Sequence, residues 1–245
     1  MTSATLSKEQ EEVEVASVGY RVAHAVNLGL FTFLAITGLM LLFPNLMDWL
    51  TYAVGVPIAS YLGIPSPVSA GAAFAMSAHV FVGELWGLFL IVYVIYLLAF
   101  RRIRVFDALR KPLSQQWREA KALFYHYTLG KPIPKDVAES LDRHNVLVAY
   151  TVIILVVGII LLSISGVLMA YRYVLNLGPG EFGLLLLLHD AGFYLTLIFI
   201  YLHLFASLHP TNRPLLLAMF GVGKVPLRWA EENMPRYLKR FLKRG

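Results

Sequence analysis

The chain has 245 residues, of which 58% are hydrophobic and only 15% are charged, and its mean hydropathy is +0.66. This composition excludes an ordinary water-soluble domain and predicts an integral membrane protein. The net charge is +6 and there is no cysteine, which excludes disulfides, cysteine-ligated iron–sulfur clusters and thioether-attached haem within the chain. Any iron–sulfur chemistry must therefore belong to a partner.

Four apolar segments are long enough to cross a hydrocarbon core, which needs about 20 residues. They comprise residues 22–43, 79–100, 146–170 and 184–207. We therefore expect an all-α fold in which residues 1–245 form one domain, an integral membrane four-helix bundle. The acidic N-terminus lacks the basic start of a cleaved signal peptide, so we expect the first apolar segment to be retained as a helix.

The basic residues indicate how the chain is oriented. Ten lysines and arginines lie in the loop 101–143 and eight in the tail 208–245, whereas residues 44–78 contain none. The positive-inside rule then predicts a multi-pass protein of the cytoplasmic (inner) membrane with both termini and the long loop in the cytoplasm. Because topology and contact with membrane lipid account for the charge, nucleic-acid binding is not needed to explain it.

The loops are expected to carry short helices of their own. Residues 44–55 are aromatic and framed by prolines, which favours an interfacial helix on the outer face. Residues 113–128 form an amphipathic pattern suited to the inner surface, and the sequence KPIPKD at 131–136 ends it. The basic tail is expected to lie on the same surface.

Four histidines sort into two depths of the predicted bundle. His189 and His203 are fourteen residues apart on the fourth helix, which places them about 21 Å apart along the axis and within about 40° of the same face. His79 begins the second helix at the outer side, level with His189, and His24 begins the first helix at the inner side, level with His203. The depths thus predict an outer pair and an inner pair.

Two histidine pairs at two depths are what two stacked, non-covalently bound b haems require. Burying polar groups in lipid is costly, so four histidines that pair by depth favour a functional interpretation. Gly38 lies fourteen residues after His24, on nearly the same face but level with the outer pair, where we expect it to make room for the outer haem. Gly166 is a second candidate for that role, although glycines in membrane helices also serve close helix packing.

Other polar residues have less specific interpretations. His126, His144 and His209 are expected at interfaces or helix ends, with His144 near enough to the inner face to approach a quinone or a haem propionate. Glu84 has three possible roles: contact with a helix of a partner subunit, proton transfer, or packing. Asp190 is expected in a hydrated position.

The chain also resembles a known family over residues from about 20 to 242. The similarity is carried by YRVAHAVNLGLFTFLAITGLMLLFPNLMDWL, by DRHN before the third helix, by LLLLHDAGFYLTLIFIYLH and by GKVPLRWAEENMPRYLKRFL. Its most specific elements are the R-x-x-H motif at 21–24 with a glycine fourteen residues later, the H-x13-H of the fourth helix and the G-K-V-x-x-R-W ending. In order and spacing these elements resemble the cytochrome b (gamma) subunit of membrane-bound formate dehydrogenase.

This resemblance implies an electron-transfer, quinone-reducing enzyme subunit with two bis-histidine b haems, the outer one receiving electrons from an iron–sulfur (beta) subunit joined to a catalytic alpha subunit. The inner haem would reduce a quinone, menaquinone in that family. The family's quinone-pocket asparagine is followed by glycine and glutamine, whereas valine, leucine and valine follow it here. The cofactor-binding positions that it implies are His79 and His189 (outer iron), His24 and His203 (inner iron), Arg21, Gly38 and Asn145 (quinone).

Several alternatives share these features. The same four-helix scaffold serves hydrogenases and thiosulfate or polysulfide oxidoreductases, so fold alone does not name the substrate. A stand-alone b-type quinone oxidoreductase would need no partner subunit, and a haem-free membrane anchor or transporter would need no histidine pairs. A di-iron enzyme is disfavoured because its H-x-x-x-H and H-x-x-H-H sets are absent from the sequence.

Overall fold

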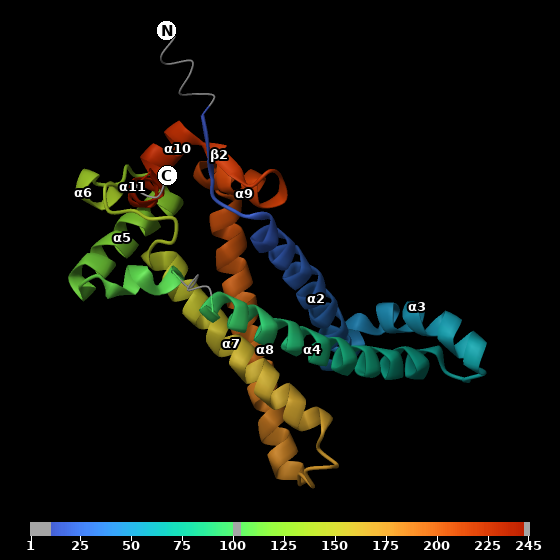
Figure 1. The fold of residues 1–245 in the computed structure, drawn as a ribbon. Coiled ribbons are helices and arrows are strands. Elements are labelled where there is room, and N and C mark those ends of the chain that lie inside the picture. Colours follow the sequence, from blue (N-terminus) through green and yellow to red (C-terminus); the bar gives the residue numbers. More distant parts are fainter. Residues whose placement is uncertain (1–10, 100–103, 243–245) are drawn as a thin grey trace. The chain divides into compact units, whose positions relative to one another are not determined.

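The computed structural model describes residues 11–99 and 104–242, which are mainly helical (Figure 1). Residues 1–10 of the N-terminus, residue 100 at the end of the second predicted span, residues 101–103 with two of the loop's arginines, and the tail residues 243–245 lie outside that description. In chain order the elements are β1 (Glu12–Glu14), α2 (Val18–Leu42), α3 (Pro44–Leu62), α4 (Pro67–Ala99), η1 (Val105–Arg110), α5 (Leu113–Leu129), α6 (Lys135–Ala138), α7 (Val146–Ala170), α8 (Pro179–Leu208), η2 (Pro210–Asn212), α9 (Arg213–Phe220), β2 (Lys224–Pro226), α10 (Leu227–Asn233) and α11 (Pro235–Leu242).

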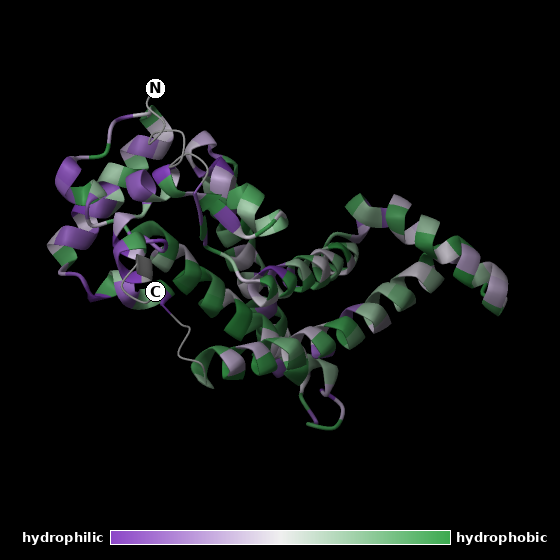
Figure 2. Ribbon diagram, turned by 45° about the horizontal axis from the view of Figure 1, so that its top comes forward, coloured by the Kyte–Doolittle hydropathy of each residue, from purple (hydrophilic) through white to green (hydrophobic). Residues whose placement is uncertain are grey.

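Four helices, α2, α4, α7 and α8, are long and apolar enough to cross a membrane. They overlap all four predicted spans and confirm the all-α membrane helical bundle. Figure 2 shows these helices mostly in the colour of hydrophobic residues, whereas hydrophilic residues gather on the short elements outside them. Their surfaces are largely exposed within the chain, as expected where lipid supplies the apolar surroundings.

Helices α3 and α4 extend furthest beyond their predicted ranges. Helix α4 begins at Pro67, twelve residues before the predicted span, because the alanine-rich stretch 67–78 forms helix without being lipid-like in composition. Helix α3 continues past the predicted residue 55 and through Pro57 to Leu62. It ends where Gly63 adopts φ +68°, a left-handed conformation that glycine tolerates best.

Helix α3 folds back along the N-terminal half of α4 (Figure 1). The two backbones touch at glycines: a Cβ atom on Gly71 would lie 2.0 Å from the carbonyl oxygen of Thr51, and one on Gly55 would lie 1.8 Å from that of Pro67. Both distances are far inside van der Waals contact, and neither neighbour is a flexible side chain. The absence of two side chains therefore sets the separation of the helices, as in other close membrane-helix pairs.

We expect Gly71→Ala to destabilise this helix pair, because the added methyl group must push two backbones apart. Overpacking of this kind costs roughly 1–3 kcal/mol, which thermal unfolding in detergent would detect. The matched control is Gly87→Ala on the same helix, where a Cβ meets nothing within 4 Å and alanine is the better helix former. Equal unfolding temperatures for the two variants would contradict the close-packing account.

The chain divides into two compact units. Unit 1 comprises Met1–Arg21, Phe100–Leu161 and Asp190–Gly245, and unit 2 comprises Val22–Ala99 and Leu162–His189. Unit 1 thus holds the short elements together with the N-terminal part of α7 and the C-terminal part of α8. Unit 2 holds nearly all of α2, the α3–α4 pair and the opposite ends of α7 and α8.

Unit 1 is tied together by a two-stranded antiparallel sheet that the sequence did not predict. Val13 of β1 pairs with Val225 of β2, in the middle of three residue pairs. Val225 also belongs to a buried apolar cluster with Val15, Ala218, Ala230 and Met234. The strands are only three residues long and separated by about 210 positions, so no local alternation marks them.

Within unit 2, helices α2 and α4 are joined by a polar contact inside an apolar surface. The indole nitrogen of Trp86 donates a hydrogen bond of 3.0 Å to the side-chain oxygen of Asn27. The Trp86 ring also packs edge-on against Phe31, with ring centroids 6.1 Å apart. A hydrogen bond between membrane helices satisfies groups that lipid cannot, so this pair fixes α2 beside α4.

Candidate functional site

Unit 2 brings together two of the predicted histidines from different helices. His79 lies on α4 and His189 on α8, and their ring centroids are 6.1 Å apart at an interplanar angle of 73°. The two residues are 110 positions apart in the chain, and the depth argument placed them at the same level. Unit 2 therefore places the two histidines of the predicted outer pair side by side.

Each ring is held by a hydroxyl on a neighbouring helix. Thr37 Oγ1 on α2 lies 2.9 Å from Nδ1 of His79, and Ser165 Oγ on α7 lies 3.0 Å from Nδ1 of His189. With both Nδ1 atoms engaged in this way, the Nε2 atoms are the nitrogens available to a metal. These two hydroxyls were not predicted from the sequence.

The glycine after each hydroxyl lets the ring approach. A Cβ atom on Gly38 would lie 3.2 Å from Cε1 of His79, and a Cβ on Gly166 would lie 3.2 Å from Cε1 of His189. Both distances are shorter than most contacts that real Cβ atoms make. Gly38 thus lies beside the outer pair, as predicted, and what it directly accommodates in the structure is the imidazole itself. Clearance for a porphyrin edge stays a prediction.

A model of the prokaryotic cytochrome b561 family matches residues 15–222. The chain belongs to this family. It is therefore a multi-pass membrane protein, a b-type cytochrome of electron transfer. The match covers the helices that carry all four predicted haem ligands. No match was found among curated proteins.

The outer pair of this cytochrome b561 fits a b haem. A metal–imidazole bond is about 2 Å long and the ring centre lies about 1 Å beyond the nitrogen, so two axial imidazoles on one iron have centres about 6 Å apart. The observed 6.1 Å between His79 and His189 agrees with that value. Their Nε2 atoms would be the axial donors.

The inner pair is distributed over the two units. His24 lies on α2 in unit 2 and His203 on α8 in unit 1. The His203 ring stacks on Phe199 of its own helix, with centroids 5.4 Å apart and planes 15° from parallel. The pairing of His24 with His203 stays a prediction.

Arg21 and Asn145, two other predicted cofactor-binding residues, have local partners within unit 1. The guanidinium of Arg21 donates a hydrogen bond to the carbonyl of Gly221, which fastens the start of α2 to the loop before β2. Asn145 caps α7: its side-chain oxygen accepts a hydrogen bond of 3.0 Å from the backbone N–H of Val148. The quinone role of Asn145 stays a prediction.

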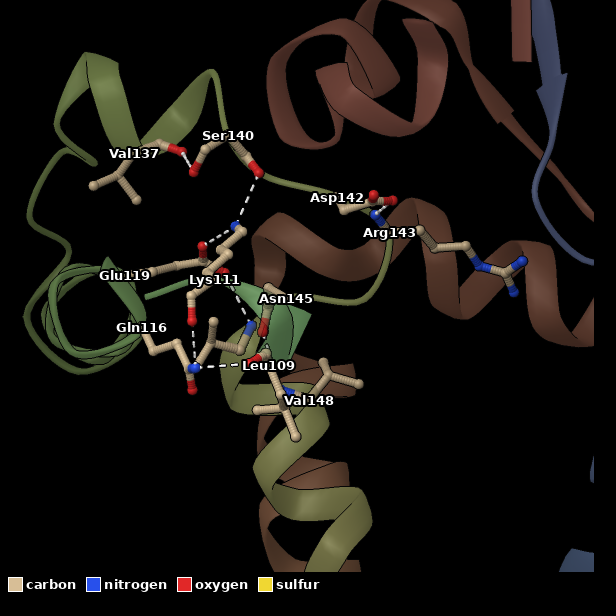
Figure 3. A network of polar contacts seen from close by, with 11 residues as sticks. Leu109, Lys111, Gln116, Glu119, Val137, Ser140, Asp142, Arg143, Asn145 and Val148 are labelled. Carbon is tan, nitrogen blue, oxygen red and sulfur yellow. Dashed lines mark hydrogen bonds and ion pairs between the residues drawn. The ribbon is translucent and has the colours of Figure 1, made fainter. Parts of the chain in front are cut away.

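A buried ion pair reinforces the same end of α7 (Figure 3). The ammonium of Lys111 pairs with the carboxylate of Glu119 on α5, and the two side chains are only 11% and 3% exposed. The second oxygen of Glu119 accepts a hydrogen bond of 2.9 Å from the N–H of Val146, the first residue of α7. A negative charge at a helix N-terminus is favourable, so the pair fixes the amphipathic loop to the membrane helix.

Glu84 has a partner in unit 2. The phenol of Tyr171, just after α7, donates a hydrogen bond of 3.0 Å to its carboxylate. This bond and the negative charge of Glu84 raise the pKa of Tyr171. The contact favours a role for Glu84 in joining α4 to the end of α7.

The burial of His144, in the loop just before α7, can be tested by the pH dependence of stability. Burial, followed by the positive charges of Arg143 and Arg240, lowers the pKa of His144 from 6.5 to about 4. Between these two pH values the unfolded chain binds a proton at His144 and the folded protein does not. The contribution of neutral His144 to the free energy of unfolding is therefore fully present above pH 6.5 and is lost as the pH falls toward 4. The loss approaches roughly 3 kcal/mol.

Thermal unfolding in detergent between pH 7.5 and 5 measures this effect. We expect the decline in unfolding temperature to be shallower in His144→Gln than in the wild type, because glutamine does not titrate. Other histidines contribute equally to both proteins, so only the difference in slope is read. Parallel curves would contradict the assignment to His144.

Proposed function

We propose that this cytochrome b561 is the di-haem membrane subunit of a respiratory formate dehydrogenase-type complex. In that role it carries electrons from an iron–sulfur subunit at the outer face to a quinone, menaquinone by resemblance, near the inner face. The observation that carries the proposal is the pair formed by His79 and His189, whose ring centroids are 6.1 Å apart. Primary substrate chemistry belongs to a catalytic partner subunit.

The chain's own residues hold and shield the site. His79 and His189 would hold the outer haem, and His24 and His203 the inner one. A b haem held in this way supplies reversible one-electron transfer. Neighbouring helices shield the outer pair from water: Thr37 on α2 and Ser165 on α7, which bind the rings, are only 3% and 1% exposed.

The residues around Asn145 suit the quinone end of this function. A cavity of about 40 Å³ in unit 1 is lined by Asn145 together with polar side chains that include His126, Tyr127 and Asn212. Such a volume has room for about two or three water molecules. Quinone reduction consumes protons, and polar, hydrated space beside the proposed quinone residue is suited to delivering them.

Isolation of the tagged chain from its native membranes under mild detergent tests the proposal. We expect an iron–sulfur protein and a formate-oxidising subunit to co-purify, formate to reduce the b bands, and a menaquinone analogue to reoxidise them. Recovery with a hydrogenase or a sulfur-compound oxidoreductase instead would reassign the complex. Reduction of the isolated chain by quinol, with no partner recovered, would favour a stand-alone quinone oxidoreductase.

The quinone assignment of Asn145 is tested in the same preparation. Asn145→Ala removes both the amide and the helix cap, whereas Asn145→Ser retains a capping oxygen. We expect reoxidation by the quinone analogue to be slowed in both variants. Slowing in the alanine variant alone would show that only the cap matters.

A further inference from the structure

The hydroxyls of Thr37 and Ser165 carry an inference that rests on the proposed haem function and goes beyond it. We propose that they are positioning residues that fix the tautomer of His79 and His189 and lower the reduction potential of the outer haem. Both hydroxyls are buried, both lie within 3.0 Å of an imidazole Nδ1, and both come from helices that carry no outer ligand.

The direction of the hydrogen bonds follows from the proposed binding of iron through Nε2 together with the backbone carbonyls beside the hydroxyls. Thr37 Oγ1 donates to the backbone carbonyl of Phe33, at 2.9 Å. That bond leaves a lone pair of the hydroxyl oxygen free to accept from Nδ1–H of His79, which is the direction required when Nε2 of the neutral ring binds iron. Ser165 Oγ likewise has a backbone carbonyl of its own helix within reach, that of Leu162 at 3.5 Å. With Nε2 of each neutral ring bound to iron, the ring proton is on Nδ1, where the hydroxyl oxygen accepts it.

The same two-residue device occurs twice. On α2 a threonine precedes Gly38, and on α7 a serine precedes Gly166. In each case the hydroxyl binds Nδ1 while the glycine accommodates Cε1 of the same ring at 3.2 Å from its would-be Cβ. A hydroxyl that bonded only its own helix backbone would need no histidine beside it. Because the hydroxyl–glycine pair is repeated beside both histidines, we infer that it acts on the metal they would share.

The chemical consequence has a definite sign. An N–H that donates a hydrogen bond leaves more electron density on the imidazole and makes it a more basic ligand. A more basic axial ligand stabilises the oxidised iron relative to the reduced iron, so the reduction potential falls. Two such bonds on one iron act in the same direction, and a lower potential at the outer haem favours electron flow toward the inner one.

Redox titration of the purified protein, followed at the b bands, tests this inference. We expect Thr37→Val and Ser165→Ala each to shift the outer-haem potential to a more positive value, with a larger shift in the double variant. A tenfold change in the ratio of reduced to oxidised haem at fixed potential corresponds to about 59 mV for a one-electron couple. Thr37→Ser and Ser165→Thr keep the hydroxyl and serve as controls that should retain the wild-type potential.

The outcomes separate this inference from the proposed function. A wild-type protein without b haem would overturn the proposed function, whereas a double variant with full haem content and unchanged potential would overturn only the tuning role. If Thr37→Val retains too little haem for titration, Ser165→Ala decides the question, because it removes a single oxygen and creates no new contact. An equal shift in Ser165→Thr would also contradict the role of the hydroxyl.

Discussion

In His79→Ala and in His189→Ala we expect the purified protein to lose the low-spin outer haem, so that the haem-to-chain ratio falls from two to one. Each histidine would supply one of two nitrogens to the iron, and the ring centroids are 6.1 Å apart, close to the separation that one iron requires. Alanine removes the donor and leaves an apolar slot without a second ligand. Haem extraction and the reduced-minus-oxidised spectrum measure the loss.

His126→Ala is the matched control for this experiment. His126 is also a histidine, but it lies near the end of α5, outside the four long helices. Its replacement should leave both haems in place. The ligand assignment would be wrong if either alanine variant of the outer pair retained the wild-type content of low-spin haem.

Replacing Lys111 by methionine is expected to have the largest effect on the stability of unit 1. The change leaves the buried carboxylate of Glu119 without its ammonium partner at the N-terminus of α7. Breaking a buried pair by removing one member costs about 3–5 kcal/mol, because an uncompensated charge remains. Thermal unfolding in detergent should show a correspondingly large drop in melting temperature at neutral pH.

An exposed ion pair in the same region gives the comparison. Arg118 on α5 pairs with Asp136 on α6 at 2.8 Å, but the two side chains are 64% and 54% exposed. Exposed pairs contribute at most about 1 kcal/mol, so Arg118→Met should melt close to the wild type. Similar melting temperatures for the Lys111 and Arg118 variants would refute the anchoring role of the buried pair.

The four spans were predictable because length and hydropathy are local properties of the sequence. The extended start of α4 was not, since residues 67–78 are apolar and small rather than lipid-like, and their helix is stabilised by backbone contact with α3. The strands β1 and β2 were missed for a related reason. Three-residue strands joined across the length of the chain leave no periodic pattern.

The outer histidine pair was predictable from helical arithmetic, because a rise of about 1.5 Å per residue converts spacing into depth. Thr37 and Ser165 were missed because a hydroxyl in a membrane helix usually bonds its own backbone and suggests nothing further. The available signal was the hydroxyl–glycine dipeptide on each of two helices at the depth of a histidine. Depth alone does not establish which rings meet, so the inner pair of His24 and His203 stays a prediction.

The most direct test of the central claim is pulsed electron paramagnetic resonance of the oxidised protein labelled with ¹⁵N-histidine. If His79 and His189 both bind the iron of one b haem, that low-spin iron will couple to two labelled imidazole nitrogens, and His189→Ala will remove this signal. Coupling to a single histidine nitrogen, or a signal unchanged in the variant, would contradict the account.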